Sequence, residues 1–135
     1  MANGLYDAGR EGFLGGDIDW DANTIKVALI DAADYTRNLA THNFWDDVPG
    51  AARVAVSGAL TGKTKVGGTA DADDVTWSSV TGDVSEEVVC FSDTGGADST
   101  DPLIFDMDTF SSGMPVTPNG GNINFVPNAS GLFKL

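Results

Sequence analysis

Residues 24–31, which read TIKVALID, form the clearest strand pattern in this 135-residue chain. Ile25, Val27 and Leu29 fall on one face of an extended segment, whereas Lys26 and Ala28 between them fall on the other. This two-residue period, with its β-branched side chains, is typical of a strand with a buried face. The chain is therefore expected to be built around β-structure.

Six further segments have the composition of strands, and together they set the fold class. They cover residues 52–60, 75–80, 88–92, 103–108, 123–126 and 131–135. Turns rich in Gly, Asp, Asn and Pro separate them. This pattern predicts a mainly β fold, either an antiparallel β-sandwich or a jelly-roll-like barrel. At this length we expect residues 1–135 to form a single domain.

Helical signals are limited to two short segments. Small and apolar residues recur with helical spacing at Leu5, Ala8, Gly9, Gly12 and Phe13. We expect Asn3 to cap this helix and Gly15-Gly16 to end it. Its glycines weaken it, so it must pack against the rest of the protein. Residues 41–47 predict one further helical turn, capped by Thr41 and ending before Pro49.

The charges are distributed unevenly along the chain. Residues 66–133 contain no Lys or Arg, whereas six of the seven basic residues precede residue 66. Eleven carboxylates lie in the stretch without basic residues: Asp71, Asp73, Asp74, Asp83, Glu86, Glu87, Asp93, Asp98, Asp101, Asp106 and Asp108. The net charge of −13 argues against nucleic acid or an anionic membrane as a partner, because both are bound through Lys and Arg.

Targeting segments and disulfides are not expected. Met1 to Gly4 lacks the charged and apolar regions of a signal peptide, and no apolar run reaches the roughly 18 residues of a membrane span. Cys90 is the only cysteine and lies in the apolar run 88–91, which predicts a buried thiol.

Cofactor and metal motifs are incomplete. Residues 57–64 resemble a phosphate-binding loop but are one residue too short. Residues 17–21 open like a calcium loop, but Ala22 and Ala28 stand where that loop requires Gly and Glu. We predict no cofactor and no metal centre, with a looser Ca²⁺ or Mg²⁺ site at the aspartates of 17–21 or 71–74 left open.

Catalytic signatures are equally sparse. His42 is the only histidine, and no nucleophile motif accompanies it. Paired carboxylates could hydrolyse glycosides while Trp20, Trp45 and Trp77 stack on sugars, but a chain rich in aspartate forms such pairs by chance. We therefore predict that the protein is not an enzyme.

Five residues are candidates for a protein interface. Phe44 and Trp45 lie in a polar turn, where large aromatic side chains either fill the core or dock on a partner. Arg53, Lys63 and Lys65 crowd the start of the acidic half. A basic patch of this kind predicts pairing with the acidic face of another copy or with a host surface.

Much of the chain resembles a family of small virion structural proteins of tailed bacteriophages. The resemblance lies in residues 4–7, 13–14, 16–20, 24–29, 51–54, 57–64, 71–76 and 103–121. It implies a capsid decoration (cement) protein on the head exterior, where trimers at local threefold positions would bind the major capsid protein. It implies no catalytic residues. The alternatives are a tail, neck or fibre component, a carbohydrate-binding attachment module, and a hydrolase.

Overall fold

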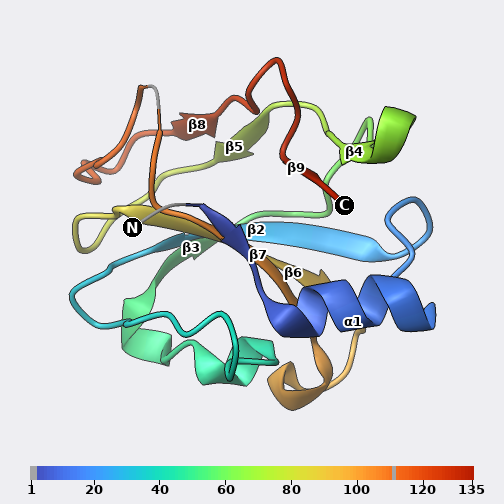
Figure 1. The fold of residues 1–135 in the computed structure, drawn as a ribbon. Helices are drawn as coiled ribbons and strands as arrows, with labels where there is room; N and C mark the ends of the chain where they lie inside the picture. Colours follow the sequence, from blue (N-terminus) through green and yellow to red (C-terminus); the bar gives the residue numbers. More distant parts are fainter. Residues whose placement is uncertain (1–2, 111) are drawn as a thin grey trace.

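The computed structural model describes residues 3–110 and 112–135, which form three layers (Figure 1). The middle layer is an antiparallel five-stranded sheet in the order β1-β7-β6-β2-β3. Its strands are β1 (Gly4–Leu5), β7 (Leu103–Met107), β6 (Glu87–Asp93), β2 (Thr24–Ile30) and β3 (Arg53–Val56).

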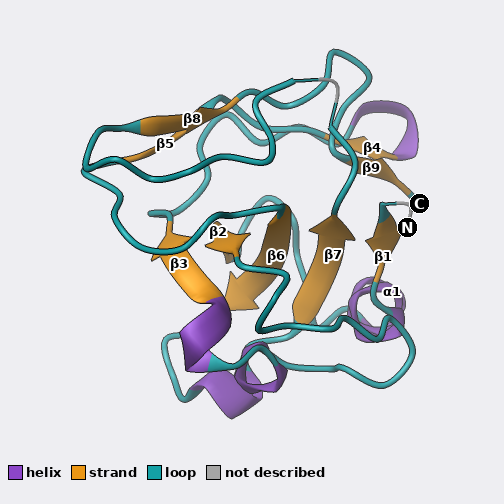
Figure 2. Ribbon diagram, turned by 90° about the vertical axis from the view of Figure 1, so that its left-hand side faces the viewer, coloured by secondary structure: helices purple, strands orange, loops and turns teal. Residues whose placement is uncertain are grey.

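Two small antiparallel sheets cover one face of the main sheet and short helices cover the other (Figure 2). The small sheets pair β4 (Thr69–Ala70) with β9 (Phe133–Lys134) and β5 (Val75–Trp77) with β8 (Ile123–Phe125). The helical layer holds α1 (Asp7–Gly15) and the 3₁₀ helices η1 (Trp45–Asp47), η2 (Gly50–Ala52) and η4 (Asp98–Thr100), while η3 (Val66–Gly68) leads into β4. The predicted mainly β, sandwich-like fold with a short N-terminal helix is confirmed.

The strand at residues 24–30 is buried on both of its faces. Ile25, Val27 and Leu29 contribute to the core beneath the small sheets, as their shared face predicts. Ala28 and Ile30 contribute to a second core beneath the helical layer. A central strand covered on both sides requires apolar residues at nearly every position, which this segment supplies.

Helix α1 can lie close against the sheet because it is rich in glycine. A Cβ atom added to Gly9 would stand 2.8 Å from the carbonyl oxygen of Ile104 in β7, so any larger residue would push the helix away. The helix ends where predicted, with Gly16 in the left-handed region at φ 80°.

The predicted start of this helix is wrong. Leu5 lies in β1, opposite Phe105, and the helix begins only at Asp7. The side chain of Asn3 accepts the N–H groups of Asp108 and Thr109, so it fastens the chain to the end of β7 and caps nothing.

Two other predicted boundaries also change. The segment 52–60 forms a strand only from Arg53 to Val56, although the N–H of Leu60 still donates to the carbonyl of Ile25. The turn before Pro49 is a 3₁₀ helix at residues 45–47, and Thr41 does not cap it. The carboxylate of Asp47 accepts the N–H groups of Asn43 and Phe44 and thereby stabilises this turn.

Cys90 is fully buried in β6, as predicted, and burial raises the pKa of its thiol. In the described part of the chain, no helix has the length and apolar character needed to cross a bilayer.

Candidate docking site

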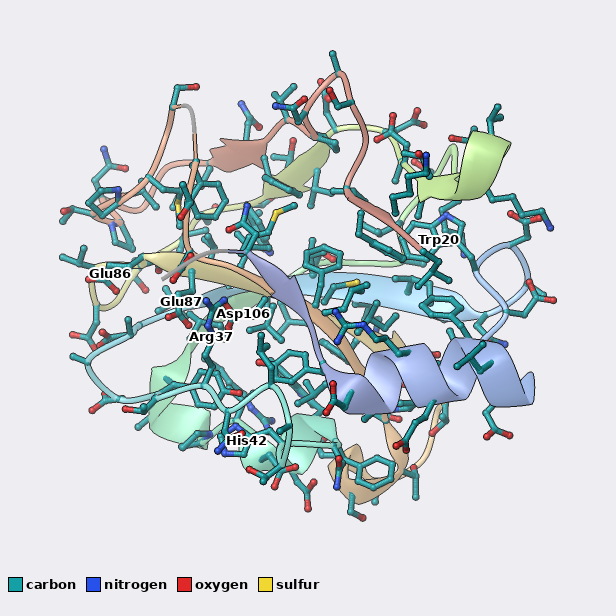
Figure 3. The ribbon with its side chains drawn as sticks, viewed as in Figure 1. Trp20, Arg37, His42, Glu86, Glu87 and Asp106 are labelled. Carbon is teal, nitrogen blue, oxygen red and sulfur yellow. The ribbon has the colours of Figure 1, made fainter. Side chains whose placement is uncertain are left out.

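An apolar groove lies at the edge of the small β4–β9 sheet, next to the end of α1. Its volume is about 470 Å³. Its lining includes Phe13, Ile18, Trp20, Lys65, Phe133 and Leu135. The ring of Phe133 meets Trp20 edge-on at 5.3 Å between centroids and lies 5.7 Å from Phe13. We call this feature the Trp20 groove; Figure 3 labels Trp20 between α1 and β9.

Three strongly exposed apolar residues either line the Trp20 groove or follow one of its lining residues in sequence. Leu14 is 89% exposed, Val66 81% and Leu135 61%. Leu135 lines the groove, Leu14 follows the lining residue Phe13, and Val66 follows the lining residue Lys65. Among the large apolar residues that the structure describes, only Val126 is exposed to a similar degree elsewhere. Three of the four most exposed large apolar residues that the structure describes are therefore in the groove lining or next to it in sequence.

The turn that carries Trp20 is held by its own polar groups. The Asp19 carboxylate accepts the N–H groups of Asp21 and Ala22, which lowers the pKa of Asp19. Lys65 forms an ion pair with Asp21, which raises the pKa of Lys65. These aspartates, which the sequence left open as a loose cation site, act as turn and ion-pair partners. The indole Nε1–H of Trp20 is buried and has no acceptor among the described residues.

The five predicted interface residues do not form one patch. Lys65 lines the Trp20 groove, and Lys63, near it in sequence, donates to the carbonyl of Asn23 at 2.6 Å. Arg53 begins β3, and Figure 1 places this end of β3 beside η2, far from η3 and the groove. The basic residues are therefore split between two ends of the molecule.

At the end of the molecule that holds Arg53, one residue of the predicted aromatic pair Phe44 and Trp45 is buried and the other is exposed. Trp45 is buried and stacks on Phe91, with ring centroids 4.2 Å apart. The guanidinium of Arg53 lies 4.2 Å from the centre of the Trp45 ring and pairs with Asp98 at 2.7 Å. Phe44 is exposed. In the folded chain, only Phe44 of these aromatics has surface to offer a partner.

The basic half of the sequence pairs with the acidic half inside the same molecule. Lys26 binds Asp93, which lowers the pKa of that carboxyl, and Arg53 binds Asp98. The uneven distribution of charge along the sequence therefore does not give the folded protein one cationic face and one anionic face. Sequence patterns alone do not reveal this, because the partners lie 45 or more residues apart.

A polar cluster is buried between the sheet and the loop that precedes η1, and sequence analysis missed it (Figure 3). Arg37 Nη1 lies 2.8 Å from Asp106 Oδ1, and Nη2 lies 3.2 Å from Asp108 Oδ2. Glu87 donates a hydrogen bond to Asp106. Burial, reinforced by the Asp106 carboxylate, raises the pKa of Glu87 to about 8, so Glu87 holds a proton at neutral pH.

Two tyrosines connect this cluster to the single histidine. The hydroxyls of Tyr6 and Tyr35 are 2.8 Å apart, and Tyr6 also donates to Asp106 at 3.4 Å. Tyr35 reaches Nδ1 of His42 at 2.9 Å. Burial raises the pKa values of both tyrosines, so they remain neutral donors. The network links the main sheet to the loop that contains His42.

Three carboxylates lie close together in another part of the molecule, away from the Trp20 groove. Asp31, Asp34 and Asp83 can bring one oxygen each to within 4.8 Å of one another. This group differs from the two aspartate clusters that the sequence indicated, at residues 17–21 and 71–74. Of those, Asp71 joins an isolated bridge with Thr64, and Asp73 accepts the hydroxyl of Thr61 at 3.2 Å.

The fold is β-sandwich-like, and the Trp20 groove is its candidate docking site. The chain matches no family model and no curated protein.

Proposed function

We propose that this chain is a non-enzymatic structural protein of a tailed-phage virion, and specifically a capsid decoration protein. It binds the major capsid protein across capsomer seams on the head exterior, with three copies at each local threefold position. The resemblance to small phage virion proteins supports this role. The observation that carries it is the apolar Trp20 groove, which the exposed Leu135 lines. The exposed Leu14 and Val66 each follow a lining residue in sequence.

Docking through this groove would stabilise a capsid shell without any catalysed reaction. Each bound copy removes apolar surface from water and adds binding free energy to the assembled state alone. A clamp of this kind opposes the outward pressure of packaged DNA. The carboxylates that remain in solvent keep neighbouring copies apart.

The carbohydrate-binding alternative has less support. Trp20, Trp45 and Trp77 are all buried, so none presents an indole face to a sugar. A tail, neck or fibre component uses the same kind of docking surface and differs in copy number.

The test is localisation in particles of the phage that encodes the chain. We expect electron microscopy and quantitative mass spectrometry to find hundreds of copies on the head surface. Particles carrying the double variant Leu14→Asp/Val66→Asp should lose this density and burst at lower temperature, whereas Val126→Asp particles should match wild type. A few to a few tens of copies away from the head, or a head surface unchanged when the gene is deleted, would refute the proposal.

A further inference from the structure

We propose that a pocket between the main sheet and the small β5–β8 sheet binds an uncharged aromatic molecule of one or two rings. We call it the Trp77 pocket, and it shares no lining residue with the Trp20 groove. Three observations carry the proposal: the size of the pocket, a lining without ionisable side chains, and the rings and thioethers that line it. The proposal does not depend on the capsid role, so either can fail without the other.

The Trp77 pocket reaches from the surface into the core of the sandwich. Its lining includes the exposed Asn124 and Asn128 together with four residues of the buried core: Leu29 in β2, Trp77 in β5, Val88 in β6 and Met107 in β7. It therefore lies between two layers that Figure 2 shows one above the other. Its volume is about 200 Å³. An apolar cavity of about 150 Å³ is enough for benzene, so one ring or a compact pair of fused rings fits here.

The lining of the Trp77 pocket selects against charged ligands. Among the lining residues that the structure describes there is no Asp, Glu, Lys, Arg or His, although the chain contains 20 carboxylates. Its polar side chains are all neutral, namely those of Asn3, Thr109, Ser112, Asn124 and Asn128. A charged ligand would lose its hydration here without meeting an opposite charge, which is costly. The ligand that suits this pocket is therefore uncharged.

The apolar part of the lining favours an aromatic ligand over an aliphatic one. Three rings line the pocket, those of Trp77, Phe110 and Phe125, and the rings of Trp77 and Phe125 are tilted by 34° with centroids 6.2 Å apart. A further ring can pack against them in offset or edge-on contact. Met107 and Met114 add two thioethers, which make favourable contacts with aromatic rings.

Two amides at the exposed end of the pocket can bind a polar group on such a ligand. The Oδ1 atom of Asn124 accepts the hydroxyl of Thr76 at 2.8 Å, and that of Asn128 accepts the N–H of Ser130 at 2.8 Å. Each side chain therefore uses its oxygen within the chain, and its N–H₂ group is the part that can donate to a ligand oxygen. The pocket thus fits a neutral ring system that carries at most a hydroxyl or carbonyl group.

The direct test compares four compounds by NMR titration of the ¹⁵N-labelled protein at pH 7. Indole is uncharged, tryptamine carries a cation on the same ring system, indole-3-acetate carries an anion, and cyclohexanol is uncharged but aliphatic. We expect indole to bind roughly tenfold or more tightly than the two charged compounds, and roughly threefold or more tightly than cyclohexanol. Equal binding of a charged compound or of cyclohexanol, or no binding of indole at millimolar concentration, would overturn the proposal.

The same titration locates the site through the backbone amides whose signals move. Amides of Trp77, Val88 and Met107 and of residues 123–125 should shift when indole is added, because these residues line the Trp77 pocket or lie between lining residues. Amides of the Trp20 groove, at residues 18–20 and 133, should not shift. Shifts confined to the Trp20 groove would refute the proposal.

Matched variants provide a second localisation. Met114→Trp enlarges a half-buried lining residue and should weaken indole binding roughly tenfold or more, because a filled pocket leaves less room for a ring. Leu14→Trp, a similar enlargement at an exposed position outside the pocket, should not weaken it. Thermal midpoints show whether each variant folds, and Ile123→Trp in β8 serves as the pocket variant if Met114→Trp does not. Equal affinities for the pocket variant and Leu14→Trp would rule out the Trp77 pocket as the site.

Discussion

The buried cluster around Arg37 and the Trp20 groove differ in the kind of side chain that they bring together and in its contact with water. In the cluster, Arg37 from a loop pairs with Asp106 and Asp108 at the sheet, largely away from water. At the groove, apolar groups from α1, a turn and β9 meet and remain partly in water. Each region also buries one unpaired polar atom, Glu87 Oε2 and Trp20 Nε1. Changes in the first region should therefore appear in unfolding, and changes in the second in binding.

The largest effect is expected from Arg37→Met, which keeps much of the side-chain length and removes the charge. Asp106 would be left buried, and Asp108 partly buried, without their cation. Breaking a buried ion pair in this way costs about 3–5 kcal/mol. Urea unfolding at pH 7 measures the loss. Arg10→Met is the control, since its pair with Asp7 is exposed, and it should leave the free energy of unfolding unchanged. Similar losses in the two variants would contradict the difference drawn between buried and exposed pairs.

The second-largest expected effect is an increase in the free energy of unfolding. Glu87→Gln should stabilise the protein at pH 8 and above, because Gln can donate to Asp106 as the protonated Glu87 does and never ionises. The pKa of Glu87 is about 8 in the folded protein against 4.5 for the ordinary side chain. Between these values the folded state binds more protons than the unfolded state, so the free energy of unfolding falls as pH rises.

Thermal unfolding of both proteins from pH 5 to pH 9 measures this gain. The wild type should lose on the order of a few kcal/mol across that window, and the variant should lose less. Parallel pH profiles for the two proteins would show that Glu87 ionises normally.

A smaller effect is expected from Gly9→Ala at the contact between α1 and β7. The added methyl group would lie 2.8 Å from the Ile104 carbonyl oxygen, so the helix must shift, at a cost of about 1–3 kcal/mol. Gly58→Ala is the matched control, because a Cβ there meets nothing within 4 Å. Equal denaturation midpoints for the two variants would show that the helix adapts freely.

Local patterns predicted the strands better than the caps. The segment 24–30 could be recognised because its apolar residues repeat every two positions and the strand is central. The start of α1 could not, because Asn3 is a plausible cap in sequence and its actual partners, Asp108 and Thr109, lie more than 100 residues away. Here the contact of Asn3 with the end of β7 outweighs the local preference of Asn for the start of a helix.

The candidate site was predicted only in part. Lys65 was recognised and lies in the groove, but Trp20 was considered only for sugar stacking. Leu14 and Val66 gave no sequence signal, since an isolated apolar residue in a short helix or turn usually fills a core. The Arg37 cluster was missed because Asp106 alternates with apolar neighbours as a solvent-facing residue would.

The position of Cys90 gives the protein an internal reporter. It is the only thiol in the chain, and it lies fully enclosed at the centre of the main sheet. An alkylating reagent can reach it only when β6 separates from its neighbours, so the labelling rate of the unmodified protein measures how often the sheet opens. Comparing that rate for free and bound protein would show whether binding a partner clamps the interior, without any engineered probe.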